Sequence, residues 1–140
     1  MVVAEDAAIR EASEKVLAQA GYSVVTAADG QEAAARYDYD RIGLVLLDLN
    51  MPFKHGWELY GSLAHLDPSV PIIIMTDHLD SSPTALMANV AALMEKPVDV
   101  EHLLKTVAEL LIESANQPPM DDFLLLGLRE ATAQSEFHRV

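Results

Sequence analysis

Five short, largely apolar runs are spaced along the chain and predict the strands of its fold. They are Val2–Ala4, Ser23–Thr26, Leu44–Leu47, Pro71–Met75 and Ala91–Met94. Short and nearly continuous apolar runs are typical of strands that are covered on both faces, as in a parallel sheet. We therefore expect five buried strands.

Segments with helical spacing separate these runs. Apolar residues recur at intervals of three and four from Ile9 to Ala20, and Gly21 follows as a helix stop signal. Similar helical patterns occur in Gly30–Tyr37, Trp57–Leu66 and Val100–Ile112. Ser82 before Pro83 is a start signal for a further helix, and Asp99 can cap the last helix. Strands that alternate with helices predict an α/β fold with right-handed crossovers and helices on both faces of a parallel sheet.

Composition and charge narrow the functions that such a fold can have. The 140 residues include 9 Lys plus Arg against 22 Asp plus Glu, so the formal net charge is −13. Because such a chain repels phosphate backbones, we expect no contact with nucleic acid. The absence of Cys excludes disulfides and thiolate ligands. No apolar run could span a membrane and no signal peptide is recognisable, which predicts a soluble cytoplasmic protein without membrane contact.

The residues that directly follow the predicted strands carry the candidate chemistry, because ligands of parallel sheets bind at the carboxyl ends of strands. These residues are Glu5, Asp6, Asp48, Asn50, Thr76 and Lys96. Three carboxylates in one cleft repel one another unless a cation neutralises them. Oxygen ligands without His or Cys favour Mg²⁺ over zinc, and Mg²⁺ readily accepts a phosphate oxygen as a further ligand.

Asp48 is the candidate acceptor of a phosphoryl group, because Asp can form an aspartyl phosphate. It follows the most apolar run, and the turn that begins at Asn50 presents it at the sheet edge. The Lys96 ammonium and the Thr76 hydroxyl would hold the remaining phosphoryl oxygens.

In this order, the motifs resemble the receiver domain of two-component response regulators over about four-fifths of the chain. The matching residues are the acidic pair Glu5 and Asp6, the phosphoacceptor Asp48 with its turn to Pro52 and then Gly56, the switch residue Thr76, and Lys96 before Pro97. The resemblance implies a flavodoxin-like, doubly wound (βα)5 fold with a five-stranded parallel sheet in the order 2-1-3-4-5.

The resemblance also implies roles in phosphoryl transfer. Asp48 would accept phosphate from a histidine kinase or a phosphotransfer protein in a phosphorelay. Lys96 would pair with the acceptor carboxylate and then the phosphate, and Thr76 would move to bond the phosphoryl group. Catalysis would be limited to self-catalysed transfer to Asp48 and autodephosphorylation, so the chain would not be an enzyme in the ordinary sense. Output would go through protein contact.

The cation site is implied in the same way. Asp6, Asp48 and the backbone carbonyl of Asn50 would bind Mg²⁺ directly, and Glu5 would act through a metal-bound water. Glu5 departs from the family pattern, since the first residue of the acidic pair is usually Asp. The bond between Lys96 and Pro97 would be cis, which costs little for a bond to proline.

The switch is a second departure from the family pattern. Leu93 stands three residues before Lys96, where the family has an aromatic switch residue. Output would therefore travel by loop and helix shifts rather than by rotation of an aromatic ring. His78 and Asn50 would flank the phosphate and could tune the attack of water on it.

Two other functions compete with a signalling module. A phosphohydrolase with an aspartyl nucleophile shares the Asp and Mg²⁺ chemistry, but it needs an acid two residues after Asp48, where Asn50 stands; an amide cannot act as a general acid. A flavodoxin-like nucleotide binder needs a Gly-rich loop after the first strand, where Glu5 to Ala8 stand instead.

The end of the chain departs from the alternating pattern. We expect the receiver to cover residues 1–115 and residues 116–140 to form a C-terminal tail without an output domain. Within the tail, Phe123 to Leu128 could form a short helix, and packing on its own domain is favoured over partner docking. The resemblance also allows this chain to form a homodimer.

Overall fold

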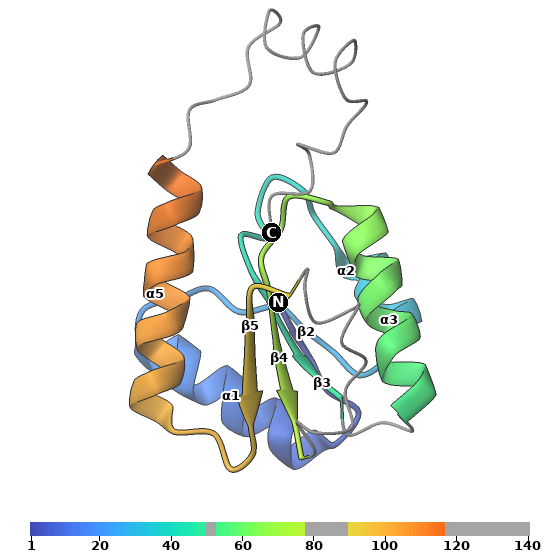
Figure 1. Cartoon of the computed structure of the whole chain (residues 1–140), viewed down its shortest axis with the longest axis horizontal. Helices are drawn as coiled ribbons and strands as arrows, with labels where there is room; N and C mark the ends of the chain where they lie inside the picture. Colours follow the sequence, from blue (N-terminus) through green and yellow to red (C-terminus); the bar gives the residue numbers. More distant parts are fainter. Residues whose placement is uncertain (50–52, 78–89, 117–140) are drawn as a thin grey trace, which may run out of the picture.

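The chain folds around one parallel sheet, which a computed structural model describes over residues 1–49, 53–77 and 90–116 (Figure 1). The strands are β1 (Val2–Val3), β2 (Thr26–Ala27), β3 (Val45–Asp48), β4 (Ile72–Thr76) and β5 (Ala92–Glu95). All paired strands are parallel, and their order is β2-β1-β3-β4-β5. The fold class and the strand order expected from the sequence are confirmed.

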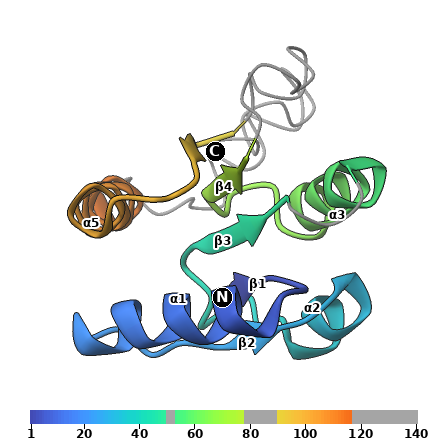
Figure 2. The ribbon, with the colours of Figure 1, turned by 90° about the horizontal axis from the view of Figure 1, so that it is seen from below.

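Helices cover both faces of this sheet. They are α1 (Ala7–Gln19), α2 (Gly30–Arg36), α3 (Phe53–Leu66) and α5 (Val100–Asn116). Figure 2 places α3 and α5 on opposite sides of the strands. Leu17 of α1 and Leu103 of α5 share one buried cluster with Val2 and Leu46, whereas Leu63 of α3 belongs to a second cluster. In the described part of the chain, no helix is long and apolar enough to cross a membrane.

Strand alternation decides which cluster each residue joins. Val2 and Leu46 face α1 and α5, whereas their neighbours Val3 and Leu47 face α2 and α3. The central strands are buried on both faces, and the residues of β4 from Ile72 to Thr76 are all buried. This matches the nearly continuous apolar runs in the sequence, because a strand covered on both sides has no solvent face for polar residues.

Capping residues set the ends of the helices. Asp6 caps α1, and Gly21 ends it with a positive φ of 99°, a conformation that suits glycine. Asp29 caps α2 by accepting from the Glu32 amide, and the Glu32 carboxylate accepts in return from the Ala28 amide. The predicted cap at Asp99 is confirmed, because its side chain accepts from the Glu101 amide at 3.0 Å.

Some element bounds differ from those expected. β2 begins at Thr26 rather than at Ser23, because its partner β1 is only two residues long and Val2 is in register with Thr26. α3 begins at Phe53 and α5 ends at Asn116, beyond their apolar patterns, because a terminal turn needs no apolar residue. The helix start at Ser82 and the tail after Asn116 lie outside the described residues.

Candidate functional site

The carboxyl ends of β3, β4 and β5 bring three of the predicted site residues to one edge of the sheet. Asp48 is the last residue of β3, Thr76 is the last of β4, and Lys96 directly follows β5. Their strands are neighbours in the sheet. Asp48 and Thr76 are the buried polar residues of the described chain, at 1% and 5% exposure.

Lys96 and Asp48 form an ion pair. The Lys96 ammonium donates a hydrogen bond to Oδ1 of Asp48, and both side chains are largely shielded from solvent. Burying an isolated carboxylate would cost several kcal/mol, so the Asp48 charge needs a close partner. The ion pair provides that partner and fixes the acceptor carboxylate at the end of β3.

The backbone positions Lys96 for this contact. Its amide donates to the carbonyl of Thr76 at 2.8 Å, which continues the pairing of β4 with β5 by one residue. The Lys96–Pro97 peptide bond is cis, as expected. Thr76 therefore anchors the lysine through its backbone while its side chain stands at the same edge.

Leu93 lies in β5, three residues before Lys96. It is partly buried and packs against the cluster on the α3 side, in register with Ile74 of β4. An aliphatic side chain in this place offers no polar group to a partner. Its role as a switch residue stays a prediction.

Asp6 has a structural role at the start of α1. One oxygen of its carboxylate accepts from the amides of Ala8 at 2.7 Å and Ile9 at 3.3 Å. These amides belong to the first helical turn, where the backbone has no intrahelical acceptor. The sequence contained this signal, because an Asp that precedes a helical run is a common N-cap.

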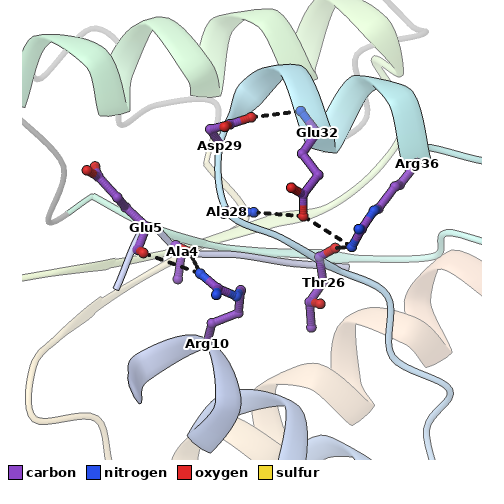
Figure 3. Close-up of polar contacts among 8 residues, drawn as sticks. All are labelled: Ala4, Glu5, Arg10, Thr26, Ala28, Asp29, Glu32 and Arg36. Atoms are coloured by element: carbon purple, nitrogen blue, oxygen red, sulfur yellow. Dashed lines mark hydrogen bonds and ion pairs between the residues drawn. The ribbon is translucent and has the colours of Figure 1, made fainter. Parts of the chain in front are cut away.

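Glu5 is exposed, and its side chain extends away from Arg10 (Figure 3). It lines a hollow of about 620 Å³ together with Asp29 and Gly30 of the α2 start and Glu58 of α3. Arg10 donates to the backbone carbonyls of Ala4 at 2.8 Å and Glu5 at 3.3 Å. This contact fixes the turn between β1 and α1, and reading the sequence by motifs did not single it out.

The carboxylates predicted to bind a cation are not assembled in the described part of the chain. Among residues 1–49, 53–77 and 90–116, no three Asp, Glu or His side chains are close enough to hold a metal ion. Asn50 and His78 lie outside the described residues. The described residues thus do not fit a Mg²⁺ site of three carboxylates, and the predicted ligand set stays a prediction.

Comparison with known proteins gives one consistent family. Residues 1–108 match the family described as response regulator receiver domain. The transcriptional regulatory protein GlrR of Escherichia coli K12 is 35% identical over 102 residues, which cover 71% of this chain and 23% of GlrR. The response regulator MprA of Mycolicibacterium vanbaalenii is 34% identical over 113 residues, covering 79% of this chain and 49% of MprA. The chain thus spans less than half of either relative.

Solved structures agree with this family. A CheY-like receiver domain protein from Methanospirillum hungatei JF-1 superposes with a TM-score of 0.75 and 28% identity, over 84% of this chain and 95% of that one. The chemotaxis response regulator CheY4 of Vibrio cholerae gives a TM-score of 0.66 and 29% identity, over 78% of this chain and 94% of CheY4. The described fold is therefore similar to nearly the whole of these two chains.

Proposed function

This chain belongs to the response regulator receiver family, and on that premise we propose that Asp48 is its phosphoacceptor. The family assigns it to two-component signalling as a receiver domain. The observation that carries the proposal is the ion pair of Lys96 with the buried Asp48, next to Thr76 at the carboxyl edge of the sheet. This edge is where parallel α/β sheets bind their ligands.

The proposed reaction is phosphoryl transfer to the Asp48 carboxylate. One of its oxygens forms a bond to phosphorus while the bond from phosphorus to the donor's leaving atom breaks. With a phosphohistidine donor, the leaving imidazole nitrogen keeps the electron pair of that bond and takes up a proton. Return to the resting state needs a water that attacks phosphorus, which releases inorganic phosphate and restores the carboxylate.

Lys96 supplies positive charge both before and after the phosphoryl transfer. Before transfer it pairs with the Asp48 carboxylate, and afterwards it pairs with an oxygen of the attached phosphoryl group. A fixed ammonium stabilises the charge that spreads over the phosphoryl oxygens during transfer. Thr76 stands at the end of the neighbouring strand, where its hydroxyl can donate to another phosphoryl oxygen after a small movement.

The proposed phosphodonor is a histidine kinase or a phosphotransfer protein, and the proposed output is protein contact. The Thr76 backbone already holds Lys96, so a movement of Thr76 towards the phosphate would pull on the end of β5. Leu93 lies in that strand and would pass the change to the cluster on the α3 side. Binding of Mg²⁺, the cytoplasmic location and a homodimer stay predictions.

Phosphorylation by a small donor tests the proposal. The purified chain is incubated with acetyl phosphate and MgCl₂, and its intact mass is followed by mass spectrometry. Asp48→Asn removes the acceptor. Asp77→Asn is the matched control, because Asp77 is an exposed acid that directly follows β4 at the same edge of the sheet.

We expect one phosphoryl adduct on the wild type and on the Asp77→Asn variant, and none on Asp48→Asn. No adduct on the wild type would contradict the proposal, as would an equal adduct on Asp48→Asn. Loss of the adduct from Asp77→Asn alone would move the acceptor to Asp77 and refute the assignment to Asp48.

A further inference from the structure

Ala4 directly follows β1, and the register of β1 with β3 indicates that it lies level with Asp48. Val2 is in register with Leu46 and Val3 with Leu47, so continuing the same register by one residue would place Ala4 level with Asp48. Both segments stay hydrogen-bonded to their outer neighbours at this level, because the Ala4 amide donates to the Ala27 carbonyl of β2 and the Leu49 amide donates to the Met75 carbonyl of β4. The chain after β1 therefore still runs along the sheet at Ala4, as β3 does at Asp48.

Alternation places Ala4 and Asp48 on one face of the sheet. Val2 and Leu46, two residues earlier on each strand, both belong to the cluster that faces α1 and α5. Side chains two residues apart on a strand share a face. Ala4 is fully buried, so the group next to the acceptor carboxylate on β1 is a methyl group that cannot bind a cation.

The next two residues do not replace this missing ligand. Glu5 lies in the bend after β1 and lines the hollow beside α2 and α3. Asp6 directs its carboxylate to the amides of Ala8 and Ile9. Figure 3 shows how the turn is held, with Arg10 on the carbonyls of Ala4 and Glu5.

We infer that Ala4 leaves the cation site of this receiver one carboxylate short, so that Mg²⁺ binds weakly and Lys96 carries most of the charge that balances Asp48. In this inference Asp6 acts as a helix cap, whereas its role as a direct ligand stays a prediction of the sequence. The inference rests on the proposed function only in taking Asp48 as the centre of the site.

The size of the effect follows from ligand count. Mg²⁺ is held by one or two carboxylates together with waters and phosphate oxygens, and its affinity rises with the charge of the ligands. A second carboxylate beside Asp48 would double the number of carboxylates that face the ion and would leave one of them without a lysine partner. Introducing that carboxylate at Ala4 is expected to tighten Mg²⁺ binding by about tenfold, which corresponds to about 1.4 kcal/mol.

The test is a titration of unphosphorylated protein with MgCl₂, followed by amide chemical shifts in ¹⁵N-labelled samples. Four proteins are compared: the wild type, Ala4→Asp, Ala4→Asn and Asp6→Asn. The Asn side chain in Ala4→Asn is nearly as large as the Asp side chain in Ala4→Asp but carries no charge. Asp6→Asn keeps the cap, since Asn caps helices about as well as Asp, but it removes the anionic ligand.

We expect weak binding by the wild type and by Ala4→Asn, binding about tenfold tighter by Ala4→Asp, and no change of the dissociation constant in Asp6→Asn. The melting temperature of Ala4→Asp should also rise with Mg²⁺, because an ion that binds only the folded state stabilises it. Equal affinity of Ala4→Asp and the wild type would overturn the inference.

Two further outcomes decide the matter if Ala4→Asp does not fold. A fall of Mg²⁺ affinity in Asp6→Asn would make Asp6 a ligand and overturn the inference, whereas an unchanged affinity supports it. Because binding is read without phosphate, a protein that binds Mg²⁺ as inferred but accepts no phosphoryl group would refute the proposed function and leave this inference standing.

Discussion

Lys96 reaches across β4 to donate a hydrogen bond to the carboxylate of Asp48, so the end of β5 is tied to the end of β3. The pair is buried in a sheet whose other described residues at this depth are mostly apolar. The resting protein therefore already neutralises its acceptor carboxylate from within the chain.

Replacing Lys96 by Met should destabilise the fold. Lys96→Met keeps the length of the side chain but leaves the Asp48 charge buried without its ammonium, and breaking a buried pair costs about 3 kcal/mol or more. The free energy of unfolding is measured with urea. In the double variant with Asp48→Asn most of this loss should disappear, and an equal loss in both backgrounds would show that the ion pair is not its cause.

Replacing Thr76 by Val should separate phosphorylation from the structural response. Val keeps the shape of the side chain but has no hydroxyl to donate to the phosphoryl group, whereas Thr76→Ser keeps the hydroxyl. We expect adduct formation in both variants, with phosphorylation-dependent amide shifts around Leu93 lost only in Thr76→Val. The same shifts in Thr76→Val as in the wild type would rule out coupling through the hydroxyl.

Replacing Asp6 by Ala should destabilise α1 because the amides of Ala8 and Ile9 lose their acceptor. The expected loss in the free energy of unfolding is about 1 kcal/mol, with little change for Asp6→Asn. Thermal and urea unfolding of the two variants measure it. A destabilisation of the same size in both would argue that the charge of Asp6, rather than its capping oxygen, matters.

Replacing Tyr37 by Phe should change how stability depends on alkaline pH. The Tyr37 hydroxyl donates to Asp67 at 2.7 Å, and burial together with this carboxylate raises the pKa of Tyr37 above its ordinary value. The folded state thus holds the phenol proton more tightly than the unfolded state. The stabilisation is complete below about pH 10, the pKa of an unperturbed tyrosine, and is lost as the pH rises above it.

For Tyr37→Phe we expect a free energy of unfolding lower by about 1 kcal/mol at neutral pH, from the lost hydrogen bond. The difference between the variant and the wild type should shrink as the pH rises beyond 10. Urea unfolding at several pH values measures both. A difference that stays constant up to strongly alkaline pH would contradict a role for the phenol proton.

The sequence predicted the sheet well because its strands are buried on both faces. The run from Ile72 to Met75 is apolar throughout and is buried in β4, and the neighbouring runs alternate with helices. β2 was misplaced by three residues because its bounds depend on the register with β1, a contact between distant segments. Local apolar pattern does not contain such information.

The candidate site was predictable to the extent that strand ends define it. Asp48, Thr76 and Lys96 each directly follow or end a strand, so the topology alone brings them to one edge. The roles of Glu5 and Asp6 could not be separated by type, since both are acids after β1. The structure distinguishes them through one hydrogen-bonded cap at Asp6, whereas the exposed Glu5 side chain has no such role in the start of α1.

The position of the phosphoryl group tests the assignment of Asp48 as the phosphoacceptor most directly. Borohydride reduces an aspartyl phosphate to homoserine, so the phosphorylated wild-type protein is treated with borohydride, digested and sequenced by tandem mass spectrometry. Protein that was never exposed to the phosphodonor serves as the control. We expect homoserine at position 48 only in the phosphorylated sample, and homoserine at another Asp position, or a reduced Glu, in place of homoserine at 48 would contradict the assignment of Asp48.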